Sequence, residues 1–119
     1  ENARVGLRFL VEVLNWPLDG ILLFGRSIGC GPALALAVEQ AVYGVILVCP
    51  FMSIRELCRE FLGSVADLLG ERFPNLERVR RIKSPLLLIH GQKDSMVPCE
   101  HGQALYEACR RRKLLVCPE

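Results

Sequence analysis

The chain has 119 residues, of which 51% are hydrophobic and 24% charged, with a formal net charge of +2 at neutral pH. This length suits one small domain or part of a larger one, and so small a charge excludes nucleic acid as a predicted partner. No apolar run approaches the roughly 20 residues that cross a bilayer. The six cysteines lack any C-x-x-C spacing, so we interpret them as free thiols in a reducing compartment. No metal site or cofactor is predicted.

The first predicted elements are a helix and a turn. Residues 3–14 predict a helix, because apolar side chains recur at i, i+4 spacing along one face. That face consists of Val5, Phe9, Leu10, Val13 and Leu14. Residues 16–20 predict a turn, since Pro17 and Gly20 interrupt the helical pattern.

Residues 21–38 are the stretch around which the chain is organised. A short apolar strand at 21–25 runs into Gly25-Arg26-Ser27-Ile28-Gly29, and an Ala/Leu-rich helix follows from Ile28 to about Gln40. Strand, G-x-S-x-G and helix in this order are typical of a nucleophile elbow, in which the serine sits strained at the apex of a tight turn. Side chains at Gly25 and Gly29 would collide, so we expect glycine to be needed at both positions. Small residues at 30 and 31 would let the helix pack closely on the sheet.

The elbow predicts a chemical role for two of its residues. Ser27 Oγ is lifted off the sheet and becomes the candidate nucleophile, provided that a base lies within reach. The backbone N–H of Ile28 points to where an oxyanion would form, and the helix N-terminus adds partial positive charge there. Arg26 is predicted to contact substrate or only to solvate the mouth of the site.

The same glycines allow an alternative. Gly25, Gly29 and Gly31 match the G-x-x-x-G-x-G loop with which some nicotinamide-dependent dehydrogenases hold a pyrophosphate. That alternative needs a charged residue at the end of the next strand and a Tyr-x-x-x-Lys pair. The next strand ends instead at Cys49, and neither Tyr43 nor Tyr106 is followed by lysine four residues later, so the sequence disfavours it.

Three further strands are predicted, at residues 44–49, 86–90 and 114–116. Residues 53–81 predict interrupted helices, either a cap over a pocket or plain packing, and include a short helix capped by Asn75. Residues 100–112 predict another helix, with a solvated basic end at 110–113. Strands alternating with helices predict an α/β fold whose parallel sheet is flanked by helices, with about four strands in sequence order and both faces covered. Ser27 and Asp94 then fall at the carboxyl ends of strands, where functional groups gather.

Ser27, then Asp94, then an expected histidine is the chain order of the α/β-hydrolases. The segment from Ser84 to Asp94 resembles the family's P-hydrophobic-HG-x-x-D segment, which presents the acid of the triad. Further segments are similar to the α/β-hydrolase domain-containing protein 17 group: Gly25–Gly29, Phe73–Asn75, Met96–Pro98 and His101–Tyr106.

The resemblance implies a serine hydrolase with Ser27 as nucleophile, the Ile28 N–H in the oxyanion hole and Asp94 as the acid. It implies a cytoplasmic, cytosol-facing enzyme acting on acyl thioesters or esters, chiefly by protein depalmitoylation. Its substrate would be an acylated protein or a lipid ester, since related branches act on acylglycerols. The group's Cys-rich N-terminus is missing here, which leaves open a peripheral membrane contact made there.

The family's histidine follows the last strand, where this chain stops. We therefore expect residues 1–119 to form one partial α/β-hydrolase domain that lacks the N-terminal strands, the oxyanion loop and the C-terminal histidine segment, and to be inactive alone. His90 is predicted to shape its own turn, and His101 to be exposed. A non-catalytic, binding member of the fold stays as the alternative.

Overall fold

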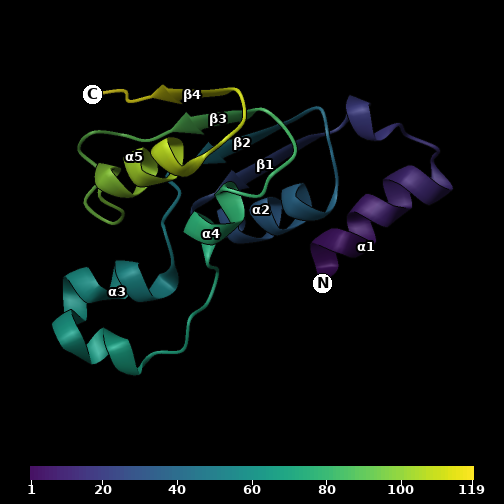
Figure 1. Cartoon of the computed structure of the whole chain (residues 1–119). Helices are drawn as coiled ribbons and strands as arrows, with labels where there is room; N and C mark the ends of the chain where they lie inside the picture. Colours follow the sequence, from purple (N-terminus) through teal and green to yellow (C-terminus); the bar gives the residue numbers. More distant parts are fainter.

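The structure, a computed structural model, describes residues 1–119 and places four strands in one sheet (Figure 1). They are β1 (Leu22–Arg26), β2 (Gly44–Val48), β3 (Leu86–Ile89) and β4 (Lys113–Val116). All pairs are parallel, and the strand order is β1-β2-β3-β4. This confirms the predicted α/β class and the prediction of four strands in sequence order.

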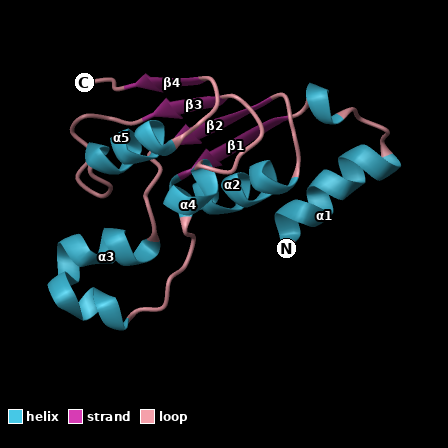
Figure 2. Cartoon of the chain, in the orientation of Figure 1, coloured by secondary structure: helices cyan, strands magenta, loops and turns pink.

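Helices fill the connections between the strands (Figure 2). The α-helices are α1 (Asn2–Arg8), α2 (Cys30–Glu39), α3 (Ile54–Leu62), α4 (Asn75–Val79) and α5 (Cys99–Ala108). A π-helical turn at Phe9–Val13 continues α1, and 3-10 turns lie at Leu18–Gly20, Ser27–Gly29 and Gly63–Leu68. None of these helices has both the length and the apolar character that crossing a membrane demands. All six cysteines are unpaired.

Helices of this chain cover one face of the sheet. Helix α2 packs on β1 and β2, α5 packs on β3 and β4, and α4 contacts both helices. Right-handed crossovers between strands that follow one another in the same direction place every connection on the same side. The prediction of cover on both faces is therefore wrong for these elements.

The core lies between the sheet and this helical layer. Strand side chains alternate between the two faces, and those of Val45, Leu47, Leu86 and Leu88 point into the core, where they are at most 3% exposed. Leu34 of α2 and Leu105 of α5 meet them from the helical side. Each fully buried leucine contributes about 2 kcal/mol relative to an exposed one.

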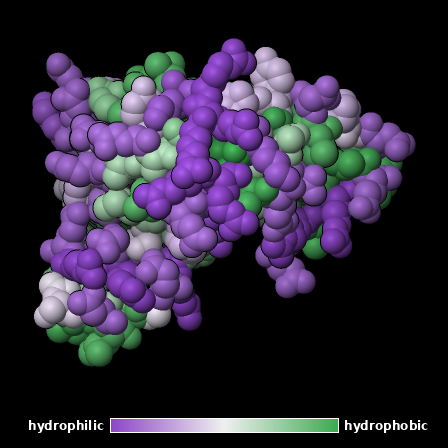
Figure 3. Space-filling model, in the orientation of Figure 1, coloured by the Kyte–Doolittle hydropathy of each residue, from purple (hydrophilic) through white to green (hydrophobic).

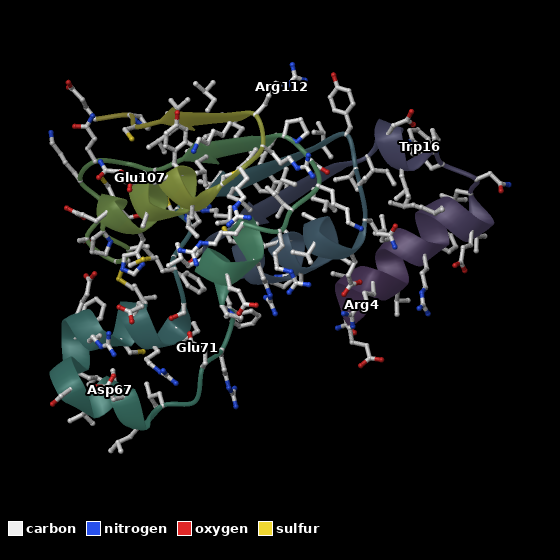
Figure 4. The ribbon with its side chains drawn as sticks, in the orientation of Figure 1. Arg4, Trp16, Asp67, Glu71, Glu107 and Arg112 are labelled. Carbon is white, nitrogen blue, oxygen red and sulfur yellow. The ribbon has the colours of Figure 1, made fainter.

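The N-terminal helix buries a different face from the predicted one. Leu7 is buried, and Leu10 and Val11 pack against the core, whereas Val5 and Val13 are each 61% exposed. The packed side chains keep the i, i+3 and i, i+4 spacing of a helix, but the spacing starts at Leu7 instead of Val5. Arg4, labelled in Figure 4, pairs with Glu39 at the end of α2.

The segment from α3 through the 3-10 turn at Gly63–Leu68 projects away from the sheet and its helical layer (Figure 1). Apolar side chains gather on the projecting tip, seen at the lower left of Figure 3, and include the exposed Phe61, Leu62, Val65 and Leu68. Ion pairs brace the segment, Arg59 with Glu56 and Asp67, and Arg55 with Glu71.

Asn75 does not cap α4 as predicted. It is the first residue of the helix and is fully buried, and the residue at the cap position, Pro74, offers no side-chain hydrogen bond. Its side-chain amide donates to the carbonyl of Phe51 at 3.0 Å, and its backbone N–H donates to that of Met52 at 2.9 Å. Asn75 therefore fixes the chain that leaves β2.

Candidate active site

Ser27 lies at the junction of β1 and α2. Its backbone has φ +49° in the left-handed region, one of four non-glycine residues with positive φ, and its side chain is exposed. This backbone angle is unfavourable for a residue with a Cβ, and residues strained in this way cluster at functional sites. Ile28 follows in the 3-10 turn that leads into α2, so its N–H lies in the first turn, where the helix dipole favours an anion.

Close packing explains two of the three glycines around Ser27. A Cβ on Gly25 would lie 2.7 Å from the carbonyl oxygen of Gly29 and 2.8 Å from Cα of Cys30, and one on Gly31 would lie 2.2 Å from the ring of Phe73. A Cβ on Gly29 would meet nothing within 4 Å. The expected need for glycine therefore holds at Gly25 and fails at Gly29.

Cys30 fastens the start of α2 to the sheet. It is buried, and its thiol donates to the carbonyl of Val48 in β2 across 3.6 Å. Burial raises the pKa of this thiol to about 12, so it stays protonated and a donor. The predicted close approach of the helix to the sheet is present at this residue.

Asp94 lies in the loop after β3. Its Oδ1 accepts the backbone N–H groups of Met96 and Val97, each at 2.9 Å, and its side chain is 19% exposed. The N–H of Val97 is the main cause that lowers the pKa of Asp94, so the carboxylate is charged at neutral pH. One oxygen thus shapes the turn, while Oδ2 is left for other contacts.

His90, at the end of β3, is fully buried. Its Nε2 donates to the carbonyl of Val97 at 2.6 Å, while Oδ2 of Asp94 is 3.9 Å away, beyond hydrogen-bond distance. Its Nδ1 has no partner and faces α5, where a Cβ on Gly102 would lie 2.6 Å away. His90 shapes the turn, as predicted.

The prediction that His101 is exposed is wrong. His101, in the first turn of α5, is 1% exposed. Its Nδ1 accepts the backbone N–H of Met52 at 3.0 Å, and its Nε2 donates to Oε1 of Glu60 at 3.0 Å. It therefore connects α5 to the segment after β2 and to α3, and it offers no free nitrogen.

The carboxyl ends of three neighbouring strands gather these groups at one edge of the sheet. Arg26 pairs with Val48 in register, and Val48 pairs with Ile89, so the next residues, Ser27, Cys49 and His90, follow at the same level. Two strand spacings of about 4.8 Å separate β1 from β3. Ser27 and the loop that carries Asp94 therefore follow strands two positions apart along this edge.

Cys49 was not singled out from the sequence. The side-chain ligand atoms of Cys49, His90 and Asp94 all lie within 4.8 Å of one another. Such a set could in principle hold a metal, but Nε2 of His90 already donates its proton to Val97 and Oδ1 of Asp94 already accepts two amides. Because these atoms already serve the turn after β3, the three groups fit a packed polar cluster better than a metal centre. One feature of the sequence could have predicted this position, because Cys49 ends a buried apolar strand just as Ser27 follows the strand before it.

A hollow of about 520 Å³ lies away from this edge. It is lined by residues near the amino ends of the strands, among them Leu22, Leu87 and Leu114 of the face that the helices leave bare. It does not include Ser27 or Asp94. The candidate site is thus an open edge of the sheet rather than this hollow.

Sequence comparisons identify relatives of the chain. The profile of the family described as "Serine hydrolase (FSH1)" matches residues 13–119. The α/β-hydrolase domain-containing protein aho-3 of Caenorhabditis elegans is 36% identical over 108 residues, which cover 91% of this chain and 32% of that protein. The α/β-hydrolase domain-containing protein 17B of Homo sapiens is 33% identical over 93 residues, covering 78% and 32%. The chain spans about a third of the length of the curated relatives it matches.

Solved structures show the same fold. The esterase domain of a Rhodothermus marinus protein superposes with a TM-score of 0.76 at 29% identity, over 98% of this chain and 55% of that one. An acetyl xylan esterase from Paenibacillus sp. R4 superposes with a TM-score of 0.79 at 18% identity, over 99% and 44%. These matches replace the dehydrogenase alternative. The chain belongs to the serine hydrolase family that the FSH1 profile describes, and it has the α/β-hydrolase fold.

Proposed function

We propose that this chain carries the nucleophile and the acid of a serine hydrolase that cleaves acyl esters or thioesters. The observation that carries the proposal is Ser27, exposed in a left-handed conformation where β1 turns into α2. Asp94 lies at the same edge of the sheet with one carboxylate oxygen free of the turn. The family match supports the same assignment.

The proposed reaction is acyl transfer in two steps. A histidine takes the proton of Ser27 Oγ as this oxygen attacks the carbonyl carbon, and Asp94 orients that histidine and stabilises its charged form. The N–H of Ile28 donates to the oxyanion, which lowers the barrier by roughly 3 kcal/mol for one such donor. The histidine then returns the proton to the leaving alcohol or thiol, and water releases the acyl group from Ser27.

The histidine is proposed to lie outside these 119 residues. Both histidines of the chain are buried at 1% exposure or less, and their nitrogens either have partners or, for Nδ1 of His90, face α5. The relatives are about three times longer than the matched part, which leaves room for the missing group. Without it, Ser27 is a poor nucleophile.

The proposed substrate is an acylated protein or a lipid ester, and protein depalmitoylation is the leading case. Two apolar side chains at the site edge support this class, since Ile28 beside Ser27 is 63% exposed and Met96 near Asp94 is 72% exposed. The names of the two relatives describe α/β-hydrolase domains and identify no substrate.

A fluorophosphonate probe tests the nucleophile in the polypeptide that contains the proposed histidine. We expect labelling of the wild type, loss of labelling in Ser27→Ala, and unchanged labelling in Ser95→Ala, which alters another exposed serine at this edge. Asp94→Asn should lower kcat by about 10⁴-fold, as in other triads. Labelling of Ser27→Ala at the wild-type rate would reject the assignment and favour a non-catalytic member of the fold.

A further inference from the structure

Cys49 occupies the strand end between the nucleophile and the acid. Strand β2 lies between β1 and β3, and Cys49 follows β2 at the level where Ser27 follows β1. Its backbone N–H donates to the carbonyl of Ile89 at 2.8 Å, so it still belongs to the hydrogen-bonded sheet edge. A side chain placed there lies beside the carboxylate that β3 presents.

The backbone of Cys49 is strained in the same sense as that of Ser27. Its φ is +48°, beside +49° for Ser27. Left-handed backbone at a residue with a Cβ persists only where the surroundings impose it, and it concentrates at functional sites. Two of the four such residues in the chain are thus adjacent at the carboxyl edge of the sheet.

The thiol of Cys49 lies near the carboxylate of Asp94. Its Sγ lies within 4.8 Å of both the Asp94 carboxylate and a ring nitrogen of His90. Burial first, and then the contact with Asp94, raises the pKa of this thiol, which keeps it protonated and able to donate. Its proton in turn lowers the pKa of Asp94, after the larger effect of the Val97 N–H.

We propose that Cys49 is a positioning residue for Asp94, whose carboxylate it orients through its S–H while the amides of Met96 and Val97 hold Oδ1. The proposal rests on the function proposed above, because orientation of Asp94 matters only if that carboxylate receives the base. Cys49 touches no reacting atom. Its raised pKa makes it a poor nucleophile, so it acts as a donor and not through covalent chemistry.

Three substitutions separate the thiol from the backbone strain. Cys49→Ala removes the donor, Cys49→Ser keeps a donor, and Cys49→Gly removes the donor while relaxing the left-handed backbone. Cys58→Ala, at a half-buried cysteine of α3, is the matched control. The first measurement is the pKa of Asp94 in the 119-residue chain, obtained from the pH dependence of the carbon-13 chemical shift of its carboxyl carbon. We expect a rise in Cys49→Ala and Cys49→Gly, and none in Cys49→Ser or Cys58→Ala.

The second measurement is steady-state hydrolysis by the polypeptide that contains the base. We expect kcat to fall about 2- to 10-fold in Cys49→Ala and Cys49→Gly with KM unchanged, the loss of one hydrogen bond, and Cys49→Ser to restore it. An unchanged Asp94 pKa and kcat in Cys49→Ala would overturn the proposal. Wild-type values of both in Cys49→Gly would also overturn it, because the effect would then come from the left-handed backbone at residue 49. Ser27→Ala separates a failure of the proposed function from a failure of the proposed role of Cys49. Full activity of Ser27→Ala would reject the proposed hydrolase, whereas the pKa of Asp94 would still test whether Cys49 orients this carboxylate.

Discussion

The two faces of the sheet are built from the same kind of residue and meet different surroundings. On the covered face, Leu47 and Leu88 are 0% exposed beneath α2 and α5. On the bare face, Phe24 is 65% exposed and Leu114 is 59% exposed. Both faces continue across all four strands, because the register aligns Phe24 with Ile46, Leu87 and Leu114.

The difference shows that connectivity decides which face of a parallel sheet is covered. Hydrophobicity cannot decide it, since continuous apolar strands supply leucine and valine to both sides. Four strands that follow one another in the same direction send every right-handed crossover to one side. Cover for the other face requires elements other than these crossovers.

The largest expected effect compares two neighbouring leucines of β3. Leu88→Ala should reduce the free energy of unfolding by about 2–5 kcal/mol, because it opens a cavity under the helical layer. Leu87→Ala, on the bare and half-buried face, should cost about 1 kcal/mol or less. Urea unfolding of both variants, followed by circular dichroism, measures the difference. Equal losses would mean that Leu87 is as deeply buried in solution as Leu88.

The local sequence pattern predicted the strands and the turn that carries Ser27, because each of these depends on residues that are neighbours in the sequence. It failed where partners are distant along the chain. His101 is buried because Met52 and Glu60, more than 40 residues away, supply its hydrogen bonds. Asn75 likewise serves the carbonyl of Phe51 rather than its own helix. Cys49 was overlooked because only the parallel register brings it between Ser27 and the loop of Asp94.

A smaller effect on the free energy of unfolding is expected from the two glycines that flank Ser27. Gly25→Ala should reduce the free energy of unfolding by about 1–3 kcal/mol, since its Cβ would meet backbone atoms that cannot move aside. Gly29→Ala, with φ −65° and open space around the Cβ, should change it by less than about 0.5 kcal/mol. Thermal unfolding of the two variants tests this asymmetry, and a costly Gly29→Ala would restore the original expectation of two required glycines.

At the carboxyl edge of the sheet, Asp94 makes the stability of the fold depend on pH, which the two apolar faces of the sheet do not. The pKa of Asp94 is lower in the folded chain than its usual value near 4. Its contribution to stability is therefore full above about pH 4 and is lost as the pH falls toward the folded pKa. Asp94→Asn should cost about 1 kcal/mol at pH 7, from weaker bonds to two amides, and should lose less stability than wild type between pH 7 and pH 3. An identical acid loss in both proteins would contradict this assignment.

The smallest effect on folding is expected on the bare face, where a change should alter association instead. Phe24→Thr keeps a residue with high strand propensity and removes an exposed aromatic ring. The free energy of unfolding should change by less than about 0.5 kcal/mol. Self-association of the 119-residue chain, measured by sedimentation velocity, should weaken, because large exposed apolar patches promote contact between molecules. A stability loss close to that of Leu88→Ala would show that the ring of Phe24 is covered in solution, and the two faces would then no longer differ.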